Sequence, residues 1–226
     1  MKLDVTDLWT RRVQFTAEID CDESASGSMK LGLAVLWAVK NDVDLRGANL
    51  RGADLRGADL RGAILESAYL RGARLDRARL DGACLDGAIL DGAILESADL
   101  RGADLRGARL ESADLRGARL DRARLDRARF HRARLDGAYL DGASGMNDYV
   151  KCIQIDTYPI TYTAEIIQIG CQRHTHQEWS EFSDAQIRAM DGAKALAWWK
   201  KHKDWLFQTI ALCPATPTGF AAEKAS

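Results

Sequence analysis

The apolar residues of this chain follow one dominant five-residue period. Between residues 44 and 143, Leu recurs at every fifth position from Leu45 to Leu140, interrupted only by Phe130, and an Ala usually stands two positions earlier. A helix has a period of 3.6 residues and a strand alternates every second residue, so neither places a five-residue spacing on one continuous face. The pattern therefore predicts a solenoid, in which each turn of chain packs against the next.

The repeated unit resembles that of the pentapeptide-repeat family, written A(D/N)LXX. It stands here as ANLRG at 48–52 and as ADLRG at 53–57 and 58–62. The resemblance implies a mainly β fold: a right-handed quadrilateral β-helix with four repeats in each coil and about five coils over residues 44–143. Ala would permit tight corners, and the Gly or Ser two positions after Leu would tolerate the turn geometry.

Different segments flank the repeat on both sides. Residues 1–43 predict a strand over 12–21 and an apolar capping helix over 29–40, which would cover the open first coil. Residues 144–214 predict a small α/β module, and residues 215–226 a flexible tail.

The module is expected to contain two strands and two helices. The strands fall in the β-branched segment 149–171, with Tyr158-Pro159 between them. A capping box from Ser183 to Gln186 opens a short helix that stops at Gly192, and a longer helix follows over 193–212. On that longer helix, Trp198 and Trp205 belong to a second apolar stripe, which suggests a homodimer through the module.

Charged residues flank the Leu positions in pairs of opposite sign. The residues before and after a Leu lie two apart, so they point to the same side of a strand. Asp59/Arg61 and Arg79/Asp81 show the two orders, and residues twenty apart would be stacked. The sides of the solenoid should then carry a checkerboard of charges that fixes register and keeps the surface soluble.

This charge pattern bears on the activity for which the family is best known. The resemblance suggests a DNA mimic that protects or modulates DNA gyrase, a topoisomerase, through an acidic surface. Residues 44–143 hold 19 Arg against 17 Asp and Glu, so they lack an uncompensated acidic stripe. Gyrase is therefore a disfavoured alternative partner.

Two departures from the regular pattern are candidate interaction surfaces. One is a set of apolar residues at outward positions, where a contiguous exposed patch would dock a terminal segment, a second subunit or another partner: Ile64, Tyr69, Cys84, Ile89 and Ile94. The other is an Arg-rich fifth coil, whose guanidinium groups suit phosphates or carboxylates: Arg122, Arg127, Arg129 and Arg132.

The segment GCQRHTHQEW at 170–179 holds the only candidate chemistry. Cys171, His174 and His176 have the residue types of a zinc half-site, and the two histidines would face one way on an extended strand. Their spacing matches none of the strong zinc patterns, so structural packing is favoured over a zinc or small-ligand module, and no cofactor is expected. A Cys–His nucleophile pair lacks any recognisable orienting acid or oxyanion device, and the chain is not expected to be an enzyme.

The composition and the cysteine count predict the cellular location of the protein. The chain has 226 residues, 46% of them hydrophobic, and a formal charge of −1, so bulk charge nominates no partner. Five cysteines and the lack of an amino-terminal apolar segment favour a reducing, cytoplasmic location without membrane insertion. The flanking segments are similar to those of uncharacterised pentapeptide-repeat proteins of bacteriophages and prophages. We therefore expect a non-enzymatic scaffold for an unidentified protein partner in a bacterial or phage context.

Overall fold

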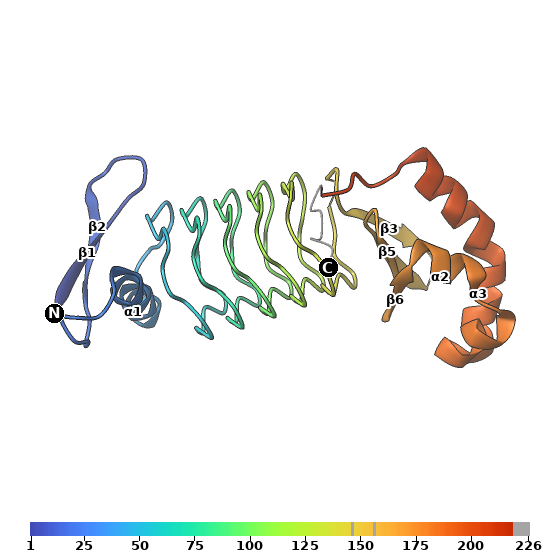
Figure 1. Ribbon diagram of the computed structural model, residues 1–226, viewed down its shortest axis with the longest axis horizontal. Helices are drawn as coiled ribbons and strands as arrows, with labels where there is room; N and C mark the ends of the chain where they lie inside the picture. Colours follow the sequence, from blue (N-terminus) through green and yellow to red (C-terminus); the bar gives the residue numbers. More distant parts are fainter. Residues whose placement is uncertain (146, 156, 219–226) are drawn as a thin grey trace, which may run out of the picture.

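The protein is a rod with a different structure at each end. The computed structural model describes residues 1–145, 147–155 and 157–218. Figure 1 shows the amino-terminal hairpin and helix at one end, the stacked repeats in the middle and a mixed module of strands and helices at the other end. The two terminal parts therefore lie far apart.

The rod is held together by a backbone ladder with a twenty-residue period. Parallel bridges join residues twenty apart, as in the column Asp59, Arg79 and Asp99. The Leu90 N–H donates to the carbonyl of Arg109 at 2.7 Å, and this pattern recurs along the rod. The repeated Leu and Ala side chains are buried throughout. The solenoid predicted from the five-residue period is confirmed, and so is the repeat β-helix that the resemblance implied.

Each five-residue unit turns through a left-handed residue. In the unit at Leu50, the Ala53 N–H donates to the Leu50 carbonyl at 3.1 Å, and Gly52 between them has φ of +67°. Glycine favours this geometry because it has no Cβ. Ser and Arg adopt the same geometry at other corners, as at Arg127 with φ of 58°.

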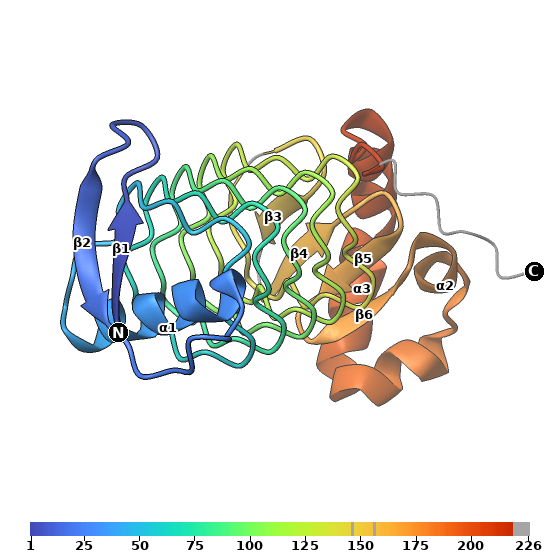
Figure 2. The same ribbon diagram turned by 60° about the vertical axis from the view of Figure 1, so that its left-hand side comes forward.

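The amino-terminal end is closed by a hairpin and helix α1 (Gly27–Lys40). The predicted strand is β2 (Val13–Glu18), and the sequence pattern missed its antiparallel partner β1 (Lys2–Thr6). Helix α1 lies across the first turn of the rod, as Figure 2 shows, at the place where the sequence predicted a capping helix. A Cβ at Gly32 would lie 2.0 Å from the Asp54 carbonyl oxygen, so the two backbones are in close contact.

The carboxy-terminal module contains a four-stranded antiparallel sheet. Its order is β3 (Lys151–Ile155), β4 (Tyr158–Tyr162), β5 (Ile166–Ile169) and β6 (Gln172–Thr175). The prediction of two strands was wrong, because strands of four or five residues joined by tight turns show little periodicity. Pro159 lies within β4, opposite Gln154, and does not separate two strands.

Two helices follow the sheet. Helix α2 (His176–Glu181) was not predicted, although Thr175 and Glu178 form a capping box at its start. Helix α3 (Asp184–Leu212) opens with the predicted capping box of Ser183 and Gln186. Non-helical geometry at Asp191 and Gly192 breaks α3, where the sequence predicted one helix to stop and another to begin.

Polar side chains of the module satisfy the open end of the rod. The hydroxyl of Thr161 donates to the Leu140 carbonyl at 3.1 Å, and the side-chain oxygen of Gln168 accepts from the Leu140 N–H at 3.0 Å. The Asn147 amide donates to the Leu125 carbonyl at 3.0 Å. These contacts replace the ladder that another level of repeats would supply.

The residues after α3 also pack against the rod. Ala215 and Thr218 are buried, the Thr216 N–H donates to the Asp148 carbonyl at 2.7 Å, and the Arg132 N–H in the repeats donates to the Thr218 carbonyl. The prediction of a flexible tail is therefore wrong for residues 215–218, because their backbone is bonded to the last repeats. The remainder of that predicted tail, 219–226, lies outside the described residues.

The close approach at Gly32 yields a stability prediction. Gly32→Ala should lower the free energy of unfolding by about 1–3 kcal/mol, because the new methyl group forces α1 away from the rod. Urea denaturation followed by circular dichroism measures the change. Gly27→Ala in the same helix is the matched control, since a Cβ there meets nothing within 4 Å. Equal stability of the two variants would contradict the role of Gly32 in the cap.

Candidate interaction surface

The sides of the rod are covered by ion pairs within and between levels. Asp59 lies 2.6 Å from Arg61 of its own unit and 3.6 Å from Arg79 of the next level. Asp104 lies 2.7 Å from Arg106 and 3.1 Å from Arg124. These contacts confirm the predicted checkerboard. The hydrogen bond from Arg61 lowers the pKa of Asp59 to about 2.

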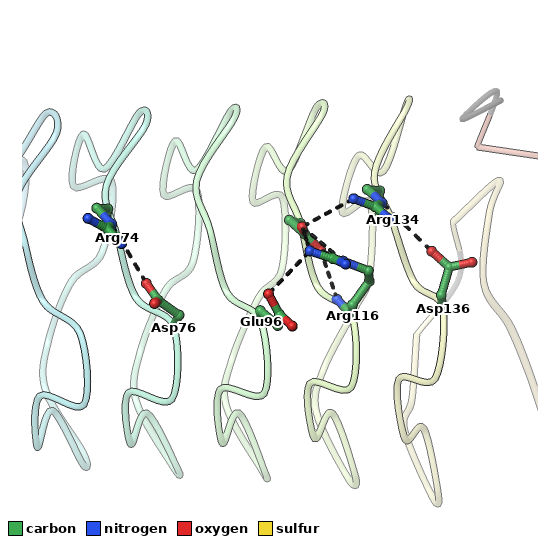
Figure 3. A network of polar contacts seen from close by, with 7 residues as sticks. Arg74, Asp76, Glu96, Arg116, Arg134 and Asp136 are labelled. Atoms are coloured by element: carbon green, nitrogen blue, oxygen red, sulfur yellow. Dashed lines mark hydrogen bonds and ion pairs between the residues drawn. The ribbon is translucent and has the colours of Figure 1, made fainter. Parts of the chain in front are cut away.

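Figure 3 shows a part of this network that links successive levels. Arg116 lies 2.7 Å from Asp114 in its own unit and 3.2 Å from Glu96 in the level before. Arg134 lies 3.5 Å from Asp114 and 3.9 Å from Asp136. Because each charge contacts opposite charges above, below or beside it, this side of the rod is neutralised by its own side chains.

The predicted apolar residues interrupt the ion pairs on three neighbouring columns. Ile64 bridges to Cys84, Tyr69 bridges to Ile89, and Ile94 stands in the next column beside Arg74. Ile64 is 56% exposed and Ile94 is 36% exposed, while the other three are half-buried. We call these five residues the apolar patch. The described terminal segments leave Ile64 and Ile94 accessible.

Two arginines beside the apolar patch were missed by sequence reasoning. Asn49 and Tyr69 occupy the position where Asp often precedes Leu, so Arg51 and Arg71 lack a carboxylate two residues earlier. The Gly52 N–H donates to the Arg71 carbonyl at 3.0 Å, which places the two arginines on successive levels of one column. Both are exposed, and within the described chain neither has an ion pair. The absence of an acidic residue at positions 49 and 69 is the sequence signal that could have identified these two arginines.

The predicted Arg-rich surface is spread around the rod. Arg122, Arg127 and Arg132 occupy successive corners with φ of 60°, 58° and 57°, and all three are exposed. Their backbones do not stack on one another, because stacked residues are twenty apart. Arg129 is bound to Glu111 at 2.6 Å. The structure therefore does not gather the four arginines into one cluster.

The three predicted zinc ligands point to separate surroundings. Cys171 is exposed, the His174 ring packs edge-on against Phe182 at 4.8 Å, and His176 Nε2 lies 2.9 Å from the Thr163 carbonyl oxygen. His176 begins α2, so the two histidines do not share one extended strand. In the part of the chain that the structure describes, no group of three His, Cys, Asp or Glu side chains is placed to hold a metal ion.

The two tryptophans of the predicted dimer stripe differ in their surroundings. Trp198 is only 7% exposed and packs inside its own module, whereas Trp205 is 40% exposed. The sequence missed this difference because both residues lie on one apolar stripe of α3. Of these two side chains, only Trp205 exposes a large area to solvent.

Comparison with known proteins places the repeats in context. The family model described as pentapeptide repeats (8 copies) matches this chain at residues 41–77, 73–111 and 108–144. No curated protein sequence matches the chain. Among the described residues, no helix is long and apolar enough to cross a bilayer.

Several solved structures are similar over the repeats. A pentapeptide repeat protein of the cyanobacterium Cyanothece 51142 is 35% identical, with 44% of this chain and 60% of that chain covered and a TM-score of 0.32. One from Nostoc PCC 7120 is 37% identical, with 43% and 68% covered and a TM-score of 0.30. QnrB1, a plasmid-mediated fluoroquinolone resistance protein, is 24% identical, with 38% and 54% covered and a TM-score of 0.25. The first of these relatives is thus matched over less than two thirds of its length.

The paired carboxylates predict a loss of stability in acid. The folded-state pKa of Asp59 is about 2, below its ordinary value of 3.8, so its pairing stabilises the fold fully above about pH 4. This stability is lost as the pH falls through 2, when the carboxylate becomes protonated in the folded state. Melting temperatures from pH 5 to pH 2 measure the effect.

The variant Asp59→Asn/Asp104→Asn should show a smaller fall in melting temperature over this range than the wild type, because two paired carboxylates are gone. Asp20→Asn is the control, since Asp20 makes no ion pair with any described residue. An identical fall in all three proteins would show that the pairs do not stabilise the rod.

Proposed function

Because this chain belongs to the pentapeptide-repeat family, we propose that it is a non-enzymatic scaffold whose rod, a right-handed quadrilateral β-helix of about five coils, binds a protein partner. The observation that carries the proposal is the apolar patch. The patch stands on a rod whose sides carry many charged residues in ion pairs. Contiguous exposed apolar surface is typical of sites where another protein docks.

The neighbouring arginines define the chemistry of the partner. Arg71 follows Tyr69 of the apolar patch by two residues, Arg51 stands one level before Arg71, and neither has an ion pair with any described residue. A guanidinium group donates two parallel hydrogen bonds to a carboxylate. A partner segment with apolar side chains next to Asp or Glu would therefore satisfy both parts of this surface.

The stacked backbone favours binding without rearrangement. Every level is bonded to the next through main-chain hydrogen bonds, so the patch residues have fixed spacings before a partner arrives. A preformed surface loses little conformational freedom on association.

The five cysteines are free, which supports a reducing, cytoplasmic setting in a bacterium or phage for the proposed interaction.

Affinity capture from bacterial lysate with matched baits tests the proposed surface. The wild type should retain a protein whose yield falls at least tenfold with the bait Ile64→Asp/Tyr69→Asp, because the new charges oppose burial of the patch. Val13→Asp is the control, since Val13 is an exposed apolar residue, 53% accessible, on the hairpin away from the patch.

The captured protein is then titrated, in purified form, against the wild type, the two variants above and Arg51→Glu/Arg71→Glu. Charge reversal should weaken binding to a partner that uses carboxylates. Equal binding by the wild type and both patch variants would refute the proposed surface, even if a partner had been captured.

The charge pairing also predicts the outcome of a gyrase assay. A mimic of DNA needs an uncompensated negative stripe to bind a basic DNA-binding surface, and most of the acids on this rod are paired with arginines. The purified protein should neither inhibit DNA supercoiling by gyrase nor rescue it from a quinolone. Inhibition or rescue at micromolar concentration would instead support a gyrase modulator.

A further inference from the structure

The turn of the amino-terminal hairpin presents a tryptophan to solvent. Trp9 is 70% exposed, more than any other aromatic residue in the described part of the chain. The turn is held by its own hydrogen bonds, because the Asp7 carboxylate accepts from the N–H groups of Trp9 at 3.1 Å and Thr10 at 2.6 Å. Burying an exposed indole removes a large apolar area from water. The turn therefore offers an aromatic anchor that the described chain leaves mostly uncovered.

Two arginines follow Trp9 in the same turn. Arg11 and Arg12 are exposed, and neither has an ion pair with any described residue. Trp and Arg are among the residue types most enriched in the side chains that dominate the binding energy of protein interfaces. The turn therefore fits a hollow that has aromatic walls and a carboxylate at its edge.

The carboxy-terminal module contains such a hollow, a cavity of about 340 Å³ bounded by the sheet, α2 and α3. Cavities that bind small molecules have volumes of roughly 300–1,000 Å³, so an indole ring fits inside this one. Cys171 and Asp191 in the lining are exposed, so the cavity opens to solvent beside them. Its aromatic walls come from four side chains: Tyr158, Trp179, Trp198 and Trp199.

The Asp191 carboxylate gives this opening a negative charge. Asp191 stands at the break in α3 and accepts a hydrogen bond of 2.5 Å from the Tyr158 hydroxyl through Oδ2. It has no ion pair with any described residue, although Lys194 Nζ lies 5.7 Å from the centre of the Tyr158 ring. A carboxylate accepts hydrogen bonds at both oxygens, and a guanidinium group is a donor whose geometry suits it. Unpaired charges of opposite sign thus stand beside the exposed indole and beside the cavity.

The two features belong to opposite ends of the molecule. Figure 1 shows the hairpin before the first coil and the module after the last one. The ladder of main-chain hydrogen bonds between them joins each level to the next, so the rod does not fold back on itself. The turn of one chain therefore cannot reach the cavity of the same chain, and a contact between them requires a second copy.

We propose that the Trp9 turn of one copy of this chain binds in the cavity of a second copy. The indole packs among the Tyr and Trp rings, and Arg11 or Arg12 pairs with Asp191. Every copy carries both halves of the contact, so two copies can make it reciprocally, or it can continue from copy to copy. This contact is independent of the apolar patch on the rod, which shares no residue with it.

Sedimentation velocity of the full chain tests the contact. From micromolar to millimolar concentration, the wild type should shift from monomer to heavier species. Trp9→Ala and Asp191→Asn should each weaken this association about tenfold or more, because the first removes the anchor and the second removes the charge while keeping an acceptor for Tyr158. Trp205→Ala is the control, since Trp205 is an exposed tryptophan of α3 outside the cavity lining. A wild type that stays monomeric, or association that either cavity-contact variant leaves unchanged or that Trp205→Ala weakens equally, would overturn the proposal.

A cross-link identifies the residues in contact. Cys171 is exposed in the cavity lining, and Thr10→Cys places a second thiol beside Trp9. Under mild oxidation, the Thr10→Cys protein should form covalent dimers or longer species through a disulfide between residues 10 and 171 of different copies, which peptide mapping by mass spectrometry identifies. The matched variant Thr10→Cys/Cys171→Ser should lose these species. Failure of this cross-link in a sample that associates, or persistence of the species without Cys171, would place the interface elsewhere and refute the contact.

Discussion

Stacking of one Leu–Ala level on the next is the interaction on which the rest of the structure depends. Each level contacts only its neighbours, so a rod of repeats always ends in exposed core and unpaired backbone groups. The two ends of this chain solve the problem differently. At one end the backbone of Gly32 approaches the Asp54 carbonyl closely, and at the other the side chains of Thr161 and Gln168 take the place of the missing ladder.

The same stacking determines how the surface is organised. Because every twentieth residue shares a column, an apolar residue has neighbours above and below that the sequence specifies directly. Ile64 therefore meets Cys84, and Tyr69 meets Ile89, whatever the side chains prefer. A patch on such a surface is built from residues distant in the chain, yet its geometry follows from the backbone alone.

The parts of the fold that could be predicted are those with strong local signals. The rod follows from the spacing of Leu45 to Leu140, and the helix break follows from Gly192 after a capping box. The small sheet was under-predicted because its short strands give no long alternation. The zinc hypothesis assumed that His174 and His176 lie on one strand, but the capping box of Thr175 begins a helix there.

The candidate sites show the same division. The apolar patch was predictable because its residues break a strict repeat. The contact between Tyr158 and Trp198 was not, because these residues are forty apart in the chain and meet only through the fold of the module. Periodicity places side chains on the face of a helix, but it does not tell which face another element will cover.

The corner residues separate what the fold requires from what it allows. An L-residue in the left-handed region costs roughly 1–2 kcal/mol, yet Arg122 adopts it, and its N–H donates to the Asp141 carbonyl at 2.7 Å. The ladder above and below imposes the backbone geometry, so the local preference of the residue is overruled. The fold thus accepts Gly, Ser or Arg at a corner. The surface that a corner presents therefore determines which of these residues stands there. Because the core of the rod repeats the same Leu–Ala pair, differences between one protein and another must lie on that surface.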